Sequence, residues 1–168
     1  MPDKQSVKLG IPNDHGTTVI GLISDTHGLL RPEVLEAFQD VTGIIHAGDV
    51  GRAEILESLR KLAPTVVVRG NIDTRTWANH LPPTAVVAVG KVNVYIYHGH
   101  EALESISEKV KCQVVVTGHS HRPVSETREG VLYLNPGSAG PKRFKLPVTL
   151  MRIFVTEYDV KAELVLLA

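Results

Sequence analysis

The chain lacks the features that mark disulfide-stabilised and membrane-spanning proteins. Its 168 residues include one cysteine, Cys112, so a disulfide within the chain is excluded, which suits a reducing compartment. The apolar runs are only as long as strands, whereas a transmembrane helix needs about 20 apolar residues. The first five residues, Met-Pro-Asp-Lys-Gln, contain no apolar core of a signal peptide. We therefore expect a cytoplasmic protein that is not associated with a membrane.

An excess of charge of one sign is also missing, since 18 Lys and Arg residues balance 18 Asp and Glu residues. Long nucleic acid is usually bound by a strongly basic face, so this balance gives such binding no support, although a small anion site stays compatible with it. The hydrophobic and charged fractions, 43% and 21%, are close to globular averages and argue against disorder. A chain of this length fits one domain. We expect residues 17–168 to form it and the polar residues 1–16 to be a flexible N-terminal extension.

The order of apolar patterns predicts an α/β protein. Short β-branched runs at 19–24, 43–45 and 65–68 alternate with helical patterns that begin at Pro32 and cover 54–62. This strand-helix order predicts a parallel sheet with right-handed crossovers. After the Pro82-Pro83 break we expect a hairpin, a helix and then further strands, in the order 84–89, 92–97, 101–110, 113–117, 123–127, 131–134, 148–156 and 160–167. Parallel units followed by antiparallel hairpins favour two stacked sheets with helices outside.

Five short polar clusters each follow one of the apolar runs. They read Ser-Asp-Thr-His at 24–27, Ala-Gly-Asp at 47–49, Arg-Gly-Asn at 69–71, Tyr-His-Gly-His at 97–100 and Thr-Gly-His-Ser-His at 117–121. Because ligands bind outside the carboxyl ends of such strands, we expect the clusters to meet at one rim. Pairs two residues apart, such as Asp25 and His27, would project to the same side of an extended segment.

The side chains delivered to this rim form a metal-ligand set: Asp25, His27, Asp49, Asn71, His98, His119 and His121. Carboxylates, imidazoles and an amide oxygen together suit borderline transition metals better than Mg²⁺ or Ca²⁺, which prefer oxygen alone. Seven ligands exceed the needs of one tetrahedral ion. Two ions fit if one carboxylate bridges them.

The five ordered motifs resemble those of the calcineurin-like metallophosphoesterases, and most closely their small, single-domain phosphodiesterase branch. The resemblance spans residues 19 to about 140. It implies an α-β-β-α sandwich of two mixed β-sheets flanked by helices, and two divalent transition-metal ions about 3.5–4 Å apart. Manganese is the expected metal, and nickel, iron, zinc and cobalt remain alternatives. By the same resemblance Asp25, His27, Asp49 and His121 would hold the first ion, Asp49 would bridge, and Asn71, His98 and His119 would complete the second.

The resemblance also implies a hydrolase in which a metal-bridging hydroxide attacks phosphorus, so that no protein nucleophile is needed. Asp49, Asn71 and His100 are then the candidate catalytic residues. In many larger members a histidine follows the asparagine, whereas here Ile72 follows Asn71 and cannot transfer a proton. We therefore expect phosphodiesters as substrates. His100 would either contact the phosphate or orient a metal ligand.

Other residues have both a functional and a structural interpretation. Arg52 and Arg143 are candidate contacts to substrate phosphate, although a solvated basic loop is the favoured interpretation. Residues 135–138 resemble a loop beside the family's metal centre, and His46 is expected to be a hydrogen-bonded core residue. The expected partner is a small phosphodiester, with nucleotides among the candidates, and a homo-oligomer stays open.

Two alternatives to a phosphodiesterase use the same fold. One is a phosphomonoesterase, and the other is a non-catalytic scaffold like the retromer subunit, which resembles this family but has a degraded metal centre. Retention of all seven ligands favours the enzyme. A nuclease is disfavoured by the neutral net charge.

Overall fold

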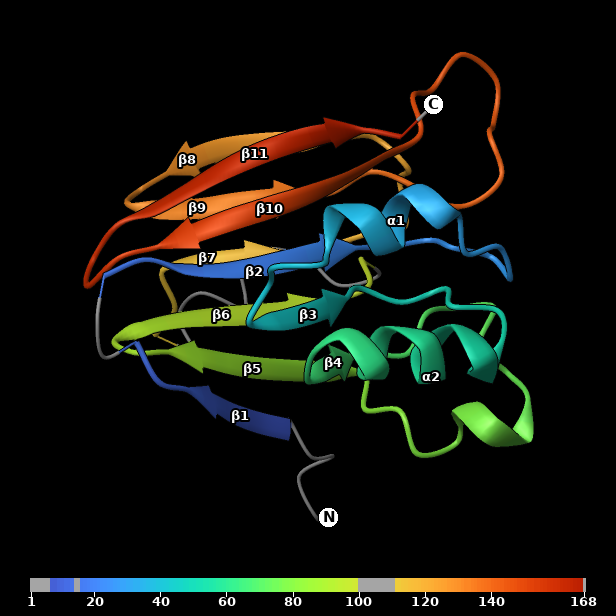
Figure 1. Ribbon diagram of the computed structural model, residues 1–168, viewed down its shortest axis with the longest axis horizontal. Helices are drawn as coiled ribbons and strands as arrows, with labels where there is room; N and C mark the ends of the chain where they lie inside the picture. Colours follow the sequence, from blue (N-terminus) through green and yellow to red (C-terminus); the bar gives the residue numbers. More distant parts are fainter. Residues whose placement is uncertain (1–6, 14–15, 100–110, 168) are drawn as a thin grey trace.

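Two mixed β-sheets stack face to face in the computed structural model, which describes residues 7–13, 16–99 and 111–167 (Figure 1). The six-stranded sheet has the order β1 (Val7–Ile11), β5 (Thr84–Val89), β6 (Val92–Tyr97), β7 (Val114–Val116), β9 (Val131–Asn135) and β8 (Val124–Arg128). The five-stranded sheet has the order β11 (Val160–Leu166), β10 (Thr149–Val155), β2 (Thr18–Ile23), β3 (Gly43–His46) and β4 (Thr65–Val67).

The central strands β2 and β3 of the five-stranded sheet are buried on both faces, which explains their continuous apolar runs. Successive side chains of a strand alternate between faces, so Leu22 of β2 packs into the core between the sheets while Ile23 faces the helices. Ile45 and Ile44 of β3 divide in the same way. The predicted parallel order is confirmed, because β2, β3 and β4 pair in parallel.

Helices α1 (Pro32–Ala37) and α2 (Ala53–Leu62) cover the outer face of the five-stranded sheet, and the short 3₁₀ helix η1 (Thr76–Ala78) follows β4 (Figure 1). Helix α1 begins at Pro32, a residue favoured in the first turn. Phe38, just after α1, is fully buried against β2. A Cβ on Gly21 would lie 2.6 Å from its ring, so the glycine makes room for the aromatic side chain. The helix predicted at 101–110 lies outside the described residues.

The N-terminal segment departs from the predicted flexible extension over residues 1–16. Val7–Ile11 form β1, which pairs in parallel with β5, and Ile11 is buried. The prediction is wrong for these five residues, because pairing with the edge of β5 satisfies backbone groups that a free extension would leave to water. That residues 17–168 form a single domain stays a prediction.

The connections place the polar clusters at one edge of the sandwich. Strands β2, β3 and β4 run in parallel, as do β6 and β7. In Figure 1 the arrowheads of β2, β3 and β7 point to the right-hand edge, where the loops that follow them gather. In the described ranges, no helix is long and apolar enough to cross a membrane.

Candidate metal centre

Backbone hydrogen bonds fasten the polar loops to one another. Beyond the end of β2, the Asp25 and His27 N–H groups donate to the carbonyls of Gly48 and Asp49, each at 3.0 Å. On the other sheet, Gly118 N–H donates to the His98 carbonyl at 2.9 Å. The ladders of both sheets thus continue past the strand ends and hold the loops in register.

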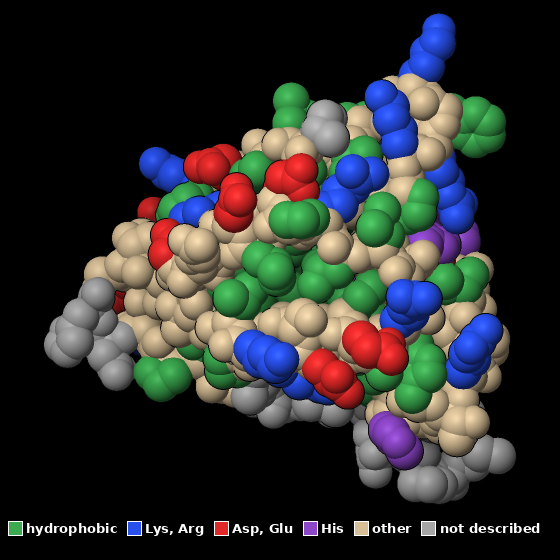
Figure 2. All heavy atoms as spheres, turned by 45° about the vertical axis from the view of Figure 1, so that its right-hand side comes forward, with side chains coloured by type: hydrophobic (Ala, Val, Ile, Leu, Met, Phe, Trp, Pro, Cys, Tyr) green, Lys and Arg blue, Asp and Glu red, His purple; other side chains and the backbone are tan. Residues whose placement is uncertain are grey.

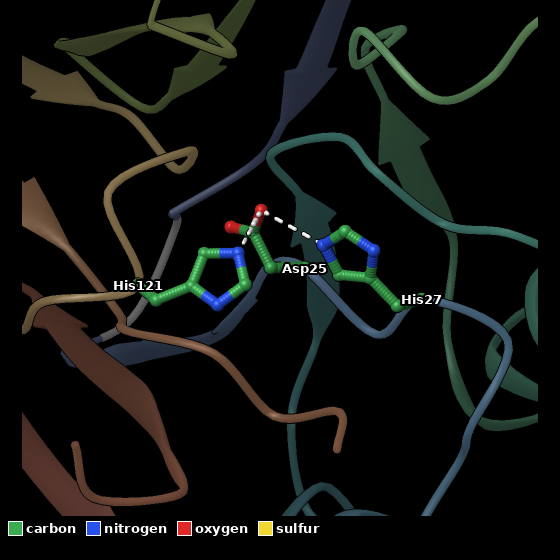
Figure 3. Close-up of side chains that lie close together, drawn as sticks. All are labelled: Asp25, His27 and His121. Carbon is green, nitrogen blue, oxygen red and sulfur yellow. Dashed lines mark ion pairs between the residues drawn. The ribbon is translucent and has the colours of Figure 1, made fainter. Parts of the chain in front are cut away.

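Asp25, His27 and His121 form the first of two clusters able to hold a metal ion (Figure 3). The Asp25 Oδ1 atom lies 3.3 Å from His121 Nε2 and 3.6 Å from His27 Nε2. Figure 3 shows both imidazoles directed at this carboxylate from opposite sides. The other oxygen of Asp25 is already engaged, because it accepts hydrogen bonds from Ser24 Oγ at 2.6 Å and from His119 N–H at 3.0 Å. Asp25 is thereby oriented with Oδ1 toward the histidines.

Asp49, His98 and His119 form the second cluster. Asn71 lies between its histidines, with Oδ1 3.0 Å from His98 Nε2 and 3.2 Å from His119 Nδ1. Asp49 Oδ2 is 3.2 Å from His98 Nε2 and 3.5 Å from His27 Nε2, so it stands between the two clusters. Asn71 and His119 are exposed, which makes the second cluster the open side of the site.

The tautomer of His98 provides a test of whether the site fits a cation. Its Nδ1 donates to the Ala47 carbonyl at 2.8 Å, so in the neutral ring Nε2 carries a lone pair. That lone pair faces three oxygens, which are Asn71 Oδ1 at 3.0 Å, Asp49 Oδ2 at 3.2 Å and Asp25 Oδ1 at 4.0 Å. Acceptors that converge in this way repel one another unless a positive charge lies among them. Burial alone would lower the pKa of His98, but the hydrogen bond that a protonated Nε2 would donate to Asp49 raises it above the usual value, so the site favours a positive charge at this point.

Buried polar atoms without hydrogen-bond partners in the first cluster point to the same requirement. Within the described part of the chain, Asp25 Oδ1 and His27 Nε2 are buried without a hydrogen-bond partner, an arrangement that is costly unless a cation compensates it. Burial favours the neutral acid at Asp49, yet hydrogen bonds from His98 and from the Ile72 N–H hold the pKa of Asp49 at about 2. A mixed set of carboxylate, imidazole and amide donors therefore fits divalent transition-metal ions.

Five of the seven predicted ligands adopt left-handed backbone conformations: Asp25 (φ 55°), His27 (45°), Asp49 (55°), His119 (69°) and His121 (61°). The prediction that Asp25 and His27 lie on an extended segment is therefore wrong, although both side chains do reach the site. Non-glycine residues seldom adopt positive φ, and such strain tends to collect at functional sites.

Two glycines permit the close approach of the loops. A Cβ on Gly70 would lie 2.1 Å from the Asp49 nitrogen, and a Cβ on Gly118 would lie 2.1 Å from Ser24 Oγ and 2.8 Å from Asp25 Oδ2. Neither position can accept a side chain without displacing a metal-ligating loop.

A buried carboxylate that the sequence did not single out joins two of these loops. Asp73 accepts hydrogen bonds from the N–H groups of Gly70 at 2.9 Å, Gly51 at 3.1 Å and Val50 at 3.2 Å. Asp73 thus ties the segment after Asp49 to the segment before Asn71. Its place after Ile72 in a polar turn offered no signal of this role.

His46 is a hydrogen-bonded core residue, as predicted. The Gly48 N–H donates to its Nδ1 at 3.1 Å, so Nε2 carries the proton and donates to Thr26 Oγ at 3.0 Å. Thr26 in turn donates to the Val50 carbonyl at 2.8 Å. This chain of bonds braces the loops after β2 and β3 from beneath.

The remaining candidates differ in their distance from the site. Arg143 Nη2 lies 3.5 Å from His27 Nδ1, and Figure 2 shows Lys and Arg side chains gathered beside the histidines at the right-hand edge. The methylenes of Arg52 lie against Gly28, next to His27. The loop at 135–138 adjoins the site, because Ser138 Oγ donates to the Asp25 carbonyl at 2.9 Å. His100 lies outside the described residues.

Residues 19–157 match the family model of the calcineurin-like phosphoesterase superfamily domain. The chain belongs to this superfamily. Probable metallophosphoesterase MJ0623 of Methanocaldococcus jannaschii is 33% identical over 163 residues, which cover 89% of this chain and 82% of that protein. Phosphodiesterase YfcE of Escherichia coli is 32% identical over 142 residues, which cover 68% and 76%.

The fold is shared more widely than the sequence. The crystal structure of Vps29 from Chaetomium thermophilum superposes with a TM-score of 0.76 at 19% identity and covers 89% of this chain and 97% of that one. At this identity the likeness is one of fold alone. The predicted family and its two-sheet α/β sandwich are both confirmed.

Proposed function

We propose that the protein is a phosphodiesterase that depends on two divalent metal ions held between the polar loops. Asp25, His27 and His121 would hold one ion, Asn71, His98 and His119 would hold the other, and Asp49 would contribute to both. The observation that carries this proposal is the pair of clusters, each with its ligand atoms within 4.8 Å of one another. The position of Asp49 Oδ2 between His27 and His98 supports the bridging role.

The protein's own residues position the reactants. Two bound ions would supply an activated water for attack on phosphorus and would neutralise charge on the phosphoryl oxygens. The Ile72 N–H fixes the Asp49 carboxylate by donating to Oδ1 at 3.0 Å, which leaves Oδ2 for the ions. Ala47 fixes the ring of His98 through Nδ1. Because Asn71 and His119 are exposed, the substrate approaches over the second cluster.

The residue after Asn71 favours diesters. Ile72 offers a backbone N–H to Asp49 and an exposed side chain that has no proton to transfer. Hydrolysis without a general acid suits an ester with a good leaving group more than a monoester with a poor one. The relative YfcE is itself named a phosphodiesterase.

Arg143 is the strongest candidate for a contact to substrate phosphate. A histidine that binds a metal through Nε2 carries its proton on Nδ1, so His27 could then no longer accept from Arg143. The guanidinium would be released beside the metal centre, where it can bind a phosphoryl oxygen. Arg52 is the second candidate, and His100 remains a predicted phosphate contact or ligand-orienting residue.

The remaining proposals concern the location, metal and substrate of the protein. We expect a small cytoplasmic hydrolase. We expect manganese in preference to nickel, iron, zinc or cobalt, and a small phosphodiester substrate, with nucleotides as candidates. The geometry favours no particular oligomer.

A metal-reconstituted activity screen tests the proposal. Protein stripped with a chelator and reloaded with Mn²⁺ should hydrolyse bis(p-nitrophenyl) phosphate faster than p-nitrophenyl phosphate. Asn71→Ala should lose most of this activity, and Arg143→Gln should raise KM more than it lowers kcat. Activity that resists the chelator, or wild-type activity in Asn71→Ala, would contradict the metal mechanism. A strong monoester preference would contradict the diester assignment, and a protein with neither metal nor turnover would revive the scaffold alternative.

A further inference from the structure

The loop between β9 and β10 carries an exposed aromatic side chain, and the arginine before it in this loop reaches the first cluster. In Figure 1 it is the orange segment that projects beyond α1. A turn closes where the Leu146 N–H donates to the Arg143 carbonyl at 3.1 Å. Phe144 follows Arg143 in this turn, is 94% exposed and has a φ of 52°. Single exposed hydrophobic residues are common, but an aromatic residue with positive φ is unusual. Neither packing nor backbone preference explains phenylalanine here.

The base of this loop is fixed to the metal-binding segment. The Ala139 N–H donates to the Ser24 carbonyl at 3.1 Å, and Arg31 Nε and Nη2 donate to the Gly140 carbonyl at 3.3 and 3.2 Å. Gly140 packs so closely that a Cβ there would lie 2.3 Å from the Thr26 carbonyl oxygen. These contacts fix Ala139 and Gly140 at the base of the loop, and the turn at Arg143 and Phe144 forms its tip.

Arg143 places the tip beside the site. Its guanidinium lies 3.5 Å from His27 Nδ1. Phe144 is the next residue along the chain, so its Cα atom lies about 3.8 Å from the Cα atom of Arg143. A phosphoryl group held by Arg143 would therefore have Phe144 as its nearest aromatic residue along the chain.

Other exposed apolar side chains also adjoin the ligands. Of the seven large hydrophobic residues that are exposed in the described part of the chain, Ile72 follows the ligand Asn71 and Leu29 lies two residues after His27. With Phe144, which follows Arg143, three of the seven lie one or two residues along the chain from a predicted ligand or from Arg143. A rim of this kind favours an apolar group on the substrate.

We propose that Phe144 binds an aromatic ester group of the substrate by packing its ring against it, an inference that rests on the proposed phosphodiesterase function. Arg143 then takes the phosphoryl oxygen, and Ile72 and Leu29 add apolar contact. The favoured substrates are diesters with an aryl or similar planar ester group, and small alkyl diesters bind less well.

Binding of two phosphinates tests this without catalysis. Diphenylphosphinate and dimethylphosphinate are monoanions like a phosphodiester, and their P–C bonds are not hydrolysed. Calorimetry on the Mn²⁺-loaded protein should show tighter binding of the diphenyl compound. Phe144→Ser should weaken that binding by about three- to tenfold, the range expected for one aromatic pair. The affinity of the Phe144→Ser variant for dimethylphosphinate should equal that of the wild type.

Tyr158→Ser is the matched control, because Tyr158 is also an exposed aromatic residue but lies in the turn at the far end of β10. The Tyr158→Ser variant should bind diphenylphosphinate and dimethylphosphinate with the same affinities as the wild type. A Phe144→Ser protein that binds both phosphinates as the wild type does, or weakens both equally, would overturn the inference. Hydrolysis of bis(p-nitrophenyl) phosphate by the wild type is measured in parallel. If the wild type hydrolyses this diester, the proposed function stands and only the inference about Phe144 has failed.

Discussion

Replacing Asp73 by alanine removes the acceptor that ties the loop after β3 to the loop after β4. The three N–H groups that Asp73 satisfies belong to Val50, Gly51 and Gly70. Two of them follow Asp49 directly and the third precedes Asn71. The carboxylate is 3% exposed, so water does not substitute for it in the folded protein. A change at this position should therefore affect both stability and metal binding.

The expected loss of stability follows from the three donors. A buried donor left without an acceptor costs about 1–3 kcal/mol, and the N–H of half-buried Gly51 can turn to water. For the two donors that remain, on Val50 and Gly70, we expect Asp73→Ala to lower the free energy of unfolding by about 2–6 kcal/mol, a large part of the ~5–15 kcal/mol typical of a domain. Asp73→Asn keeps one acceptor oxygen and should lose about half as much.

Urea unfolding of the metal-free proteins measures this loss, and calorimetric titration with Mn²⁺ of the folded variants measures the second effect. Loss of a partner that orients metal ligands typically weakens affinity by about 10–100-fold, and we expect this for Asp73→Asn. Asp40→Ala is the control, because Asp40 pairs with Arg152 at the surface and such pairs contribute under ~1 kcal/mol. If Asp73→Ala unfolds at the same urea concentration as the wild type and binds Mn²⁺ equally well, the proposed role of Asp73 in holding the two loops together is refuted.

Three further predictions concern pH, packing and metal. Burial lowers the pKa of His46 to about 4, against the opposing pull of Asp73, Asp25 and Asp49. Since the unfolded chain takes up this proton below about pH 6.5 and the folded chain does not, stability should fall by about 3 kcal/mol between pH 6.5 and 4. Urea unfolding of His46→Gln should lack this part of the decline. Gly70→Ala should abolish Mn²⁺ binding in calorimetry, because its Cβ would overlap the Asp49 backbone; ordinary affinity would contradict the packing. Mn²⁺ at 100 times its Kd should stabilise the wild type by about 2.7 kcal/mol, seen as a raised Tm, and an unchanged Tm would argue against the site.

The sequence predicted the strands and the metal-ligand types because both leave local signals. Apolar runs such as Val92–Tyr97 match the observed strands closely, and Asp, His and Asn follow them at the strand ends. Asp73 was missed because its partners come from two separate loops, at Gly70 and at Val50 and Gly51. Strand β1 was missed although Val7, Leu9 and Ile11 alternate along it, because the residues around it are polar and include turn formers such as Pro12 and Gly16.

The backbone conformation of the ligands shows why the residue types and the geometry agree. Asp, Asn and His are several-fold enriched among the few residues with positive φ, whereas most other side chains avoid it. The five strained ligand positions are all Asp or His, so the side chains that suit the metal are also those that tolerate the turn. Phe144 has positive φ without that tolerance. The ligand loops can therefore be held in place at modest cost by hydrogen bonds donated to the Gly48 and Asp49 carbonyls and to the Asp73 carboxylate. The residue type does not explain the strain at Phe144, and the proposed contact with the substrate would explain it.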